Sequence, residues 1–399
     1  MGENDYGVEN LIMHIKKTIR YTIQQLYKFI YQSSYAIMAK YRPINEKKVV
    51  MSLYRSNKLE GNLKAFYNEV KKLHPELEIQ LIHPNNKIGY GLFKEISYFC
   101  DAKYIVLDDY YLPVYLIHPR KETRIVQLWH AAGAFKKFGY STVGTKFGSD
   151  RKYLEIVPIH SNYTHVYVSS EQVITQYAEA FNMPKDKIYP LGIPRIDFFS
   201  DEFYVKETQQ KITKSLTIEQ QRKTKILIAP TYRANASQRE TELNFAVELT
   251  NILKDIDSDK LLIFVPHPYV YKNELQSLVD LQHKHPERII IGENFSINEW
   301  MLVVDAFITD YSSAIFEFAL LKKPLAHYVP DLPEYQKNRG FYNNIENISD
   351  GMILTNPKQL FHWINERSTG EFYNTDRMVQ YNFSVTSNIT KGIIEHLMN

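Results

Sequence analysis

Residues 305–319, Asp-Ala-Phe-Ile-Thr-Asp-Tyr-Ser-Ser-Ala-Ile-Phe-Glu-Phe-Ala, decide the fold of this chain. The apolar residues 306–308 predict a buried strand, residues 309–313 a polar turn, and the residues from Ala314 onward a helix. Backbone N–H groups at the start of a helix lack partners within the helix, and the helix dipole favours negative charge there. The stretch therefore predicts a phosphate site at the carboxyl end of a strand.

Candidate ligands follow from this pattern. The side chains expected to hold a bound donor molecule are Thr309, Asp310, Ser312, Ser313 and Glu317, the last reaching a sugar hydroxyl one turn along the helix. The same pattern has a second interpretation, because Asp310 or Ser312 could simply cap the helix. The turn alone leaves the two interpretations evenly balanced.

Composition limits the classes of protein to which the chain can belong. Its 399 residues suit two domains of ordinary size, and 44% hydrophobic residues are enough for packed cores. A net charge of +3, without an arginine-rich run, argues against a nucleic-acid partner. Cys100 is the only cysteine, which excludes disulfides within the chain and zinc sites built from cysteines. Neither a secretory signal nor an apolar run of roughly 18 residues is present, so we expect an intracellular protein.

Residues 1–42 predict an amphipathic helix outside the two domains. Residues 10–42 contain six lysines and arginines but no acidic residue. Apolar residues recur at spacings of three and four, and aromatic residues lie between them: Ile12, Ile15, Ile19, Ile23, Leu26 and Ile30, with Tyr21, Tyr27, Phe29, Tyr31 and Tyr35. Such a helix is typical of peripheral attachment to an anionic membrane surface, here with the aromatic rings at the interface. The alternatives are a helix that packs on the protein itself and one that dimerises.

The remaining chain alternates short apolar strands with longer helical stretches. The strands are continuous and β-branched, as in buried parallel sheets. We therefore predict an α/β fold of two doubly wound parallel-sheet domains facing a cleft, 43–200 and 201–399, with a polar linker at 200–224. The last helix is a candidate to pack back on the first domain.

Ligands of open parallel sheets bind beyond the carboxyl ends of the strands. In this sequence two histidines are expected at such strand ends. His130 follows the strand 125–128 after one residue, and the small residues up to Gly133 leave room for a substrate. An imidazole titrates near neutral pH, so this position suits a general base, and Lys136 could offset phosphate charge nearby. His267, between two prolines, and Arg233 follow two strands of the second half. Both halves thus contribute to one cleft.

Two further residues and the acidic clusters complete the candidate list. Arg195 and Asp197 lie at the end of the first domain and are predicted at the rim of the acceptor or phosphate site. The best acidic cluster, residues 255–259, precedes a strand and so lies at the opposite end of the sheet. We therefore predict no metal. Without a glycine-rich dinucleotide motif or a Walker loop, we also predict no cofactor.

The motifs, taken in order, resemble the CDP-glycerol glycerophosphotransferase family of teichoic acid synthesis. The resemblance covers about 103–342 and is carried by Trp129-His130-x-x-Gly133, Lys136-Lys137-Phe138-Gly139, Pro230-Thr231-Tyr232-Arg233, His267-Pro268, Thr309-Asp310-Tyr311-Ser312-Ser313 and Arg339-Gly340-Phe341-Tyr342. Each motif alone is weak, and the ordered set is specific. Family polymerases often have Trp-His-Gly-Thr-Pro where this chain has residues 129–133, Trp-His-Ala-Ala-Gly. With the short chain, this departure favours the primase-like branch.

The resemblance implies a GT-B-like fold and a function. It implies transfer of glycerol phosphate from CDP-glycerol to a polyprenyl-diphosphate-linked disaccharide, with release of CMP, at the cytoplasmic face of the cell membrane. His130 would be the base and His267 a phosphate ligand, with Arg233, Thr309, Ser312 and Ser313 on the pyrophosphate and Glu317 on the ribose. Other wall-polymer enzymes would be candidate partners.

Three alternatives stay open at this point. One is a glycerol- or ribitol-phosphate polymerase of the same family. Another is a GT-B glycosyltransferase that uses a nucleotide sugar, because that class would share the fold, the membrane helix and the strand-end phosphate site. The third is a non-catalytic scaffold in a wall-polymer complex, against which two histidines facing one cleft argue.

Overall fold

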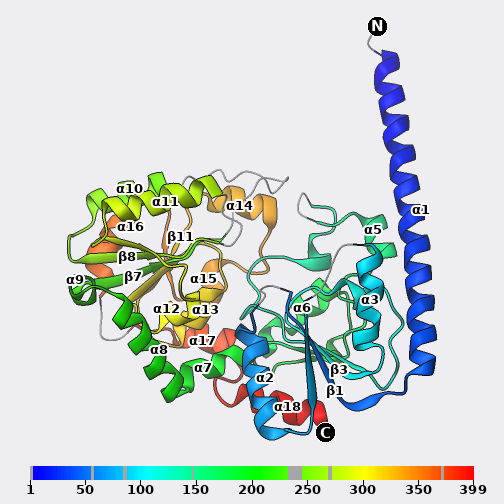
Figure 1. The fold of residues 1–399 in the computed structure, drawn as a ribbon. Helices are drawn as coiled ribbons and strands as arrows, with labels where there is room; N and C mark the ends of the chain where they lie inside the picture. Colours follow the sequence, from blue (N-terminus) through cyan, green and yellow to red (C-terminus); the bar gives the residue numbers. More distant parts are fainter. Residues whose placement is uncertain are drawn as a thin grey trace.

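The protein contains two α/β domains that lie side by side (Figure 1). The computed structural model describes residues 3–54, 58–83, 88–145, 148–231, 245–267, 272–369 and 373–399, with side chains from residue 14 onward except at 272–273. Each domain is built on a six-stranded sheet in which every described strand pair is parallel. The predicted fold of two doubly wound sheets is confirmed.

The sheet of the first domain has the strand order β2-β1-β3-β4-β5-β6. Its strands are β1 (Asn45–Ser52), β2 (Glu78–Ile82), β3 (Ala102–Leu107), β4 (Arg124–Gln127), β5 (His165–Tyr167) and β6 (Ile188–Tyr189). The helices are α2 (Gly61–Leu73), α3 (Tyr90–Phe99), α4 (Leu112–Tyr115), α5 (Arg151–Ile156) and α6 (Ile174–Phe181), with the 3₁₀ turns η1 (Gly139–Thr142), η2 (Glu171–Val173), η3 (Lys185–Lys187) and η4 (Pro194–Ile196). This order belongs to the doubly wound type.

The sheet of the second domain has the order β12-β11-β10-β7-β8-β9. Its strands are β7 (Thr224–Ile228), β8 (Lys260–Phe264), β9 (Ile289–Ile291), β10 (Ala306–Thr309), β11 (Leu325–Tyr328) and β12 (Met352–Leu354). The order reverses between β7 and β10, and in such sheets the crevice for a ligand opens beyond the carboxyl ends of these two strands. All residues of β8 and β10 are buried, which explains the apolar runs 261–264 and 306–308 within them.

Helices cover both faces of this second sheet and connect it to the first domain (Figure 1). They are α7 (Asp197–Ser200), α8 (Glu202–Ser215), α9 (Ile218–Arg222), α10 (Phe245–Asp255), α11 (Lys272–Lys284), α12 (Ile297–Met301), α13 (Ala314–Ala319), α14 (Leu332–Arg339), α15 (Ile345–Ile348), α16 (Pro357–His362), the π-helix η5 (Trp363–Arg367), α17 (Asp376–Asn382) and α18 (Ile389–Met398). After α17 the chain returns to the first domain, where α18 packs on α2 and η4.

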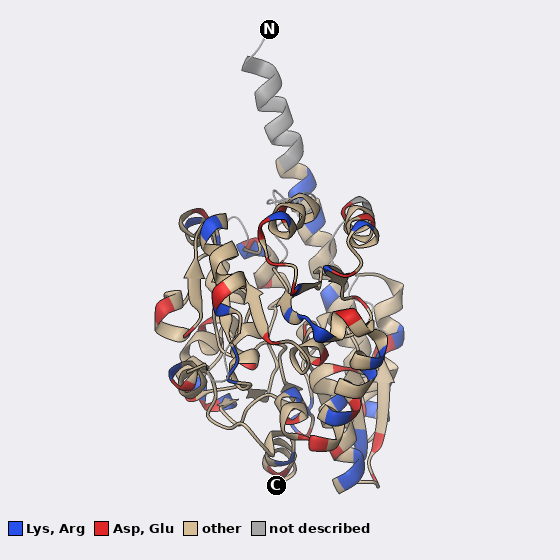
Figure 2. Ribbon diagram, turned by 90° about the vertical axis from the view of Figure 1, so that its left-hand side faces the viewer, with Lys and Arg blue, Asp and Glu red and all other residues tan. Residues whose placement is uncertain are grey.

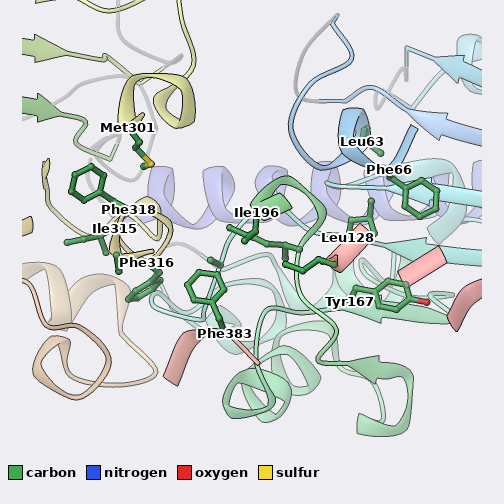
Figure 3. Close-up of a cluster of buried hydrophobic side chains, with 14 of the residues drawn as sticks. Leu63, Phe66, Leu128, Tyr167, Ile196, Met301, Ile315, Phe316, Phe318 and Phe383 are labelled. Atoms are coloured by element: carbon green, nitrogen blue, oxygen red, sulfur yellow. The ribbon is translucent and has the colours of Figure 1, made fainter. Parts of the chain in front are cut away.

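The two domains share a continuous apolar core. One cluster of buried side chains contains Phe66 and Leu128 of the first domain together with Met301 and Phe316 of the second (Figure 3). Burial of such side chains is the main favourable term in folding. The domains are therefore packed against each other rather than joined only by the linker.

The N-terminal helix α1 (Glu3–Tyr41) runs along one side of the first domain (Figure 1). It packs on α3 and α5 through a face that contains Tyr31 and Tyr35, which are 0% and 3% exposed. The rings of Tyr27 and Tyr31 contact Phe93 edge-on, with centroids 5.5 and 5.4 Å away. The expectation that these tyrosines lie at a membrane interface is therefore wrong, because the helix face that they share packs on the protein itself.

The aliphatic side of α1 faces away from the protein. Its exposed large side chains are Ile15, Ile19, Ile23, Leu26, Phe29, Ile30 and Ile37. Basic residues are visible on the described part of α1, near the edge of the domain (Figure 2). In the described part of the chain, none of the helices is sufficiently long and apolar to cross a membrane.

Candidate active site

His130 lies in the turn after β4, and neighbouring groups hold its ring. Its Nδ1 is 3.0 Å from the backbone oxygen of Asp108 and 3.5 Å from Oδ2 of Asp109. A carbonyl oxygen only accepts hydrogen bonds, so Nδ1 carries the hydrogen in this contact and the lone pair of the neutral ring lies on Nε2. The Asp109 carboxylate stabilises the ring once Nε2 has taken up a proton. With its side chain 25% exposed, His130 is suited to act as a base toward a bound molecule.

Trp129 holds the histidine from the other side. Its ring stacks on the His130 ring at 4.2 Å between centroids, and its backbone is left-handed with a φ of 52°. The Trp129 N–H donates to Oε1 of Gln127 at 2.9 Å, and its carbonyl accepts from Nδ2 of Asn62 at 2.7 Å. These bonds stabilise a turn that a non-glycine residue adopts only at a cost. The sequence reasoning did not assign Asn62, Gln127 or Asp109 to His130. Asn62 and Asp109 are distant from His130 in the sequence and meet its turn only in the folded protein.

The loop after His130 crosses to the second domain. The Lys137 N–H donates to the Gly340 carbonyl at 3.1 Å, and the Tyr342 N–H donates to the Phe135 carbonyl at 3.1 Å. Lys136 and Phe341 form an isolated antiparallel bridge, which places Lys136 at the domain interface. Two motifs that are about 200 residues apart in the sequence therefore form one structural unit.

Gly133 is the point of closest approach in this loop. Its N–H donates to Oγ of Ser169 at 2.7 Å, and its φ is +65°. A Cβ atom at this position would lie 2.4 Å from Oδ1 of Asn382 and 2.9 Å from the Phe316 ring. Glycine is required here both for the backbone conformation and for the contact with the second domain.

The turn after β10 is organised by Asp310, which is only 2% exposed. Its Oδ1 accepts from the N–H groups of Thr231 (2.8 Å) and Tyr311 (2.6 Å), and its Oδ2 accepts from Oγ1 of Thr231 at 2.8 Å. The Thr309 hydroxyl, also 2% exposed, donates to the Ala229 carbonyl at 2.6 Å. These bonds join the carboxyl ends of β7 and β10, the two strands that flank the predicted crevice. Asp310 and Thr309 therefore support the turn from its buried side.

Ser312 and Ser313 lie on the more accessible side of the same turn, where both are partly exposed. Oγ of Ser312 accepts from the N–H of Ala314 at 3.3 Å, while the Ser313 side chain makes no capping bond. The helix α13 that begins here has only six residues. The capping interpretation of Ser312 thus has a structural basis, and phosphate binding by the two serines stays a prediction.

Glu317 and Arg195 are paired with each other across the domain interface. Nε of Arg195 donates to Oε2 of Glu317 at 3.0 Å, and Nη2 of Arg195 contacts Oε1 of the same carboxylate. Nδ2 of Asn298 donates to Oε2 at 2.5 Å, and Glu317 is 1% exposed. A ribose contact by Glu317, or a phosphate contact by Arg195, would require this pair to open.

The carboxylate of Asp197 contacts the start of the last helix, α18. It accepts from the N–H groups of Ile389 (2.9 Å) and Thr390 (2.7 Å) and from the Thr390 hydroxyl (2.6 Å). Asp197 thus satisfies the first amides of α18 and ties this helix to the first domain. The predicted place of Asp197 at the rim of an acceptor site is not tested by these contacts.

His267 lies just beyond β8, at the carboxyl edge of the second sheet, and is partly exposed. In the sheet order β8 is next to β7, so His267 and the Thr231 turn follow neighbouring strands. Arg233 and Pro268 lie outside the described residues, as does Tyr232. Among the residues that are described, no group of three His, Cys, Asp or Glu side chains is arranged to hold a metal ion.

Comparisons with known proteins identify the class. The family model of CDP-Glycerol:Poly(glycerophosphate) glycerophosphotransferases matches residues 34–386. A teichoic acid ribitol-phosphate primase of Bacillus spizizenii is 35% identical over 355 residues, which cover 85% of this chain and 87% of the primase. The chain therefore belongs to this family of teichoic acid synthesis transferases, as the motifs indicated.

Other relatives agree with this assignment, and a solved structure has a similar fold. A glycerol-phosphate primase of Bacillus subtilis is 27% identical, with 88% of this chain and 89% of the primase covered. The ribitol-phosphate polymerase TarK of Staphylococcus aureus is 31% identical, with 81% of this chain but 62% of the polymerase covered. The wall teichoic acid polymerase TagF has a similar fold, with a TM-score of 0.71 at 19% identity over 96% of this chain and 97% of that chain.

Proposed function

We propose that this protein is a primase-type transferase that moves one alditol phosphate unit from a CDP-activated donor to a polyprenyl-linked saccharide. The observation that carries this proposal is His130, whose ring is fixed at the carboxyl edge of the first sheet by Asp108, Asp109 and Trp129. The two primases support it further, because each aligns with this chain over most of both lengths.

In the proposed reaction an acceptor hydroxyl attacks the phosphorus that bears the alditol. A new oxygen–phosphorus bond forms, the bond to the CMP oxygen breaks, and CMP leaves. Nε2 of His130 takes the proton of the attacking hydroxyl, while Nδ1–H stays on the Asp108 carbonyl and Asp109 stabilises the imidazolium. His267, Arg233, Ser312 and Ser313 are the proposed ligands of the diphosphate. Phosphoryl transfer leaves mainly positioning and charge stabilisation to the protein.

The identity of the alditol is the finer part of the proposal. The relative at 35% identity is named for ribitol phosphate and the one at 27% for glycerol phosphate, so ribitol phosphate is the first candidate. The family description names CDP-glycerol, which keeps the predicted glycerol donor as the second.

A donor and acceptor assay tests the proposal. The purified protein is incubated with CDP-ribitol, CDP-glycerol or a panel of nucleotide sugars, together with a synthetic polyprenyl-diphosphate disaccharide, and products are weighed by mass spectrometry. We expect CMP release and the mass of one added alditol phosphate. Addition of many units would show a polymerase, and sugar transfer a glycosyltransferase. Absence of turnover together with absence of any thermal shift by nucleotides would favour a scaffold.

Peripheral attachment to the cytoplasmic face of the membrane through α1 is the second part of the proposal. Large aliphatic side chains face outward along the helix, and residues 14–42 contain basic but no acidic side chains. An apolar face with basic residues suits the surface of an anionic bilayer. The acceptor of the proposed reaction is itself a lipid, which requires the enzyme to work at that surface.

A matched pair of substitutions tests this attachment. Ile23 on α1 is 61% exposed and Ile218 on α9 is 72% exposed. We expect Ile23→Asp to reduce co-sedimentation with vesicles that contain anionic lipid, because a charge is placed in the apolar face, while Ile218→Asp binds as the unmodified protein does. Equal binding by both variants would contradict attachment through this face.

A further inference from the structure

We infer that Asn62, Arg195 and Glu317 form a chain of contacts, called here the positioning chain. It sets the turn of His130 in the first domain against the predicted phosphate turn, residues 309–313, in the second. The inference rests on the proposed function and adds residues that act through others rather than on the substrate. Each link of the chain is a contact between described residues, and the chain crosses the domain interface once.

The first link is the side-chain amide of Asn62, at the start of α2. This residue is 1% exposed. Its Nδ2 donates to the Trp129 carbonyl at 2.7 Å, and its Oδ1 accepts from the Arg195 N–H at 2.9 Å. One buried amide therefore connects the residue that precedes His130 to the backbone of Arg195. A shift of η4 would be passed directly to the turn of His130.

The second link is the ion pair of Arg195 and Glu317. Two guanidinium nitrogens contact the two carboxylate oxygens, which fixes distance and orientation together. Glu317 lies on α13, one turn after Ser313, and Asn298 of α12 supports its carboxylate. The pair thus holds the helix that follows the predicted phosphate turn.

The buried ion pair contributes to the orientation of the two domains rather than to the stability of the fold. Desolvation offsets much of the attraction in a buried ion pair, so its replacement by apolar residues of similar size often leaves stability unchanged. The apolar cluster that spans both domains already holds them together (Figure 3). A buried pair of defined geometry adds orientation, and a misplacement of about 1 Å at reacting groups lowers rates about 100-fold.

The test replaces the pair by apolar residues and reads rate, donor binding and fold separately. In Arg195→Met/Glu317→Leu we expect an unchanged melting temperature, unchanged donor affinity by calorimetry, and a kcat lower by about 10- to 100-fold. Asn62→Asp keeps an acceptor for the Arg195 N–H but has no donor for the Trp129 carbonyl, and we expect a similar loss of kcat. Full kcat in the double variant would overturn the inference. Weaker donor binding with an unchanged kcat in Glu317→Gln would also overturn it, because Glu317 would then contact the donor.

A second measurement does not depend on the reaction. Spin labels at Lys121→Cys and Lys284→Cys, both exposed and on different domains, report the distance between the domains in a Cys100→Ala background. We expect the distance distribution to broaden in the double variant and not in Ile218→Asp. An unchanged distance distribution would contradict the positioning role of these residues, even if the protein turned over none of the donors tested. If only the proposed function were wrong, the unmodified protein would show no turnover, while the distance distribution of the double variant would still broaden.

Discussion

The turns after β4 and β10 occupy equivalent places, each at the carboxyl edge of a parallel sheet, but their motif residues have opposite tasks. In the first turn His130 is partly exposed and neighbouring groups hold it. In the second turn Asp310 is buried and its carboxylate holds the neighbouring groups. A motif at a strand end therefore contains two kinds of residue, those presented to a ligand and those that shape the turn. Substitution distinguishes the two.

Each turn also has a buried histidine behind it. His160 packs edge-on against Trp129, with ring centroids 5.5 Å apart, and stacks on Phe181. Nδ1 of His327 lies 2.7 Å from the carbonyl oxygen of Asp310, and its Nε2 lies 2.8 Å from Oγ of Ser349. Burial lowers the pKa of His160 to about 3 and that of His327 to about 4. Both rings are therefore neutral near pH 7, and both are buried, whereas the His130 side chain is 25% exposed.

The largest effect is expected from His130→Ala. Loss of a general base should lower turnover about 100-fold or more while stability stays nearly unchanged, since the ring is partly exposed. CMP release and thermal melting measure the two properties. His118→Ala, an exposed histidine of the same domain, is the control and should retain full activity. Near-full activity of His130→Ala would remove this residue from the mechanism.

Asp310→Ala should act in the opposite way, through the fold. Two N–H groups and one hydroxyl lose their acceptor, and we expect unfolding free energy to fall by about 3 kcal/mol. Urea denaturation measures this loss, and Asp186→Ala, at an exposed carboxylate, should stay within about 0.5 kcal/mol of the unmodified protein. If Asp310→Ala were fully stable but inactive, Asp310 would belong with the presented residues.

Gly133→Ala tests how closely the first turn approaches the second domain. The substitution combines a left-handed backbone with a contact of 2.4 Å to Asn382, so we expect a loss of about 2 kcal/mol. Gly144→Ala has a φ of +85° and nothing within 4 Å of the new atom, which isolates the backbone cost. In urea denaturation, Gly133→Ala should have a clearly lower free energy of unfolding than Gly144→Ala. Equal losses would mean that the domain contact gives way without cost.

The last prediction concerns the effect of pH on stability through the two buried histidines. The unfolded chain binds protons at these histidines below about pH 6.5, whereas the folded protein does not until about pH 4 for His327 and pH 3 for His160. Their contribution is therefore complete above pH 6.5 and decreases as the pH falls, by up to about 2 kcal/mol per ring at pH 5. His160→Phe should flatten this dependence in urea denaturation at pH 7.5 and 5, and His118→Ala should not. An unchanged slope in His160→Phe would contradict a neutral ring at this site.

Prediction from the sequence worked where the signal is local. The continuous apolar strands and the ordered motifs were sufficient to predict the two parallel sheets, the positions of the strand-end turns and the family. It was wrong for Tyr31 and Tyr35, because a helix with two apolar faces does not reveal which face packs on its own protein. It also did not foresee the pairing of Glu317 with Arg195, which are 122 residues apart.

The sequence by itself determined the strands, the helices and the chemical groups available at each strand end, because apolar periodicity and residue type act within a few neighbouring residues. Only the tertiary structure decided which of those groups are presented and which are buried as supports. Domain packing made that choice for two sites, since it brings Gly133 against Phe316 and Arg195 against Glu317. The pairing of β7 with β10 made it for Asp310. A buried carboxylate must find partners inside the protein, and those partners come from segments that no local pattern connects.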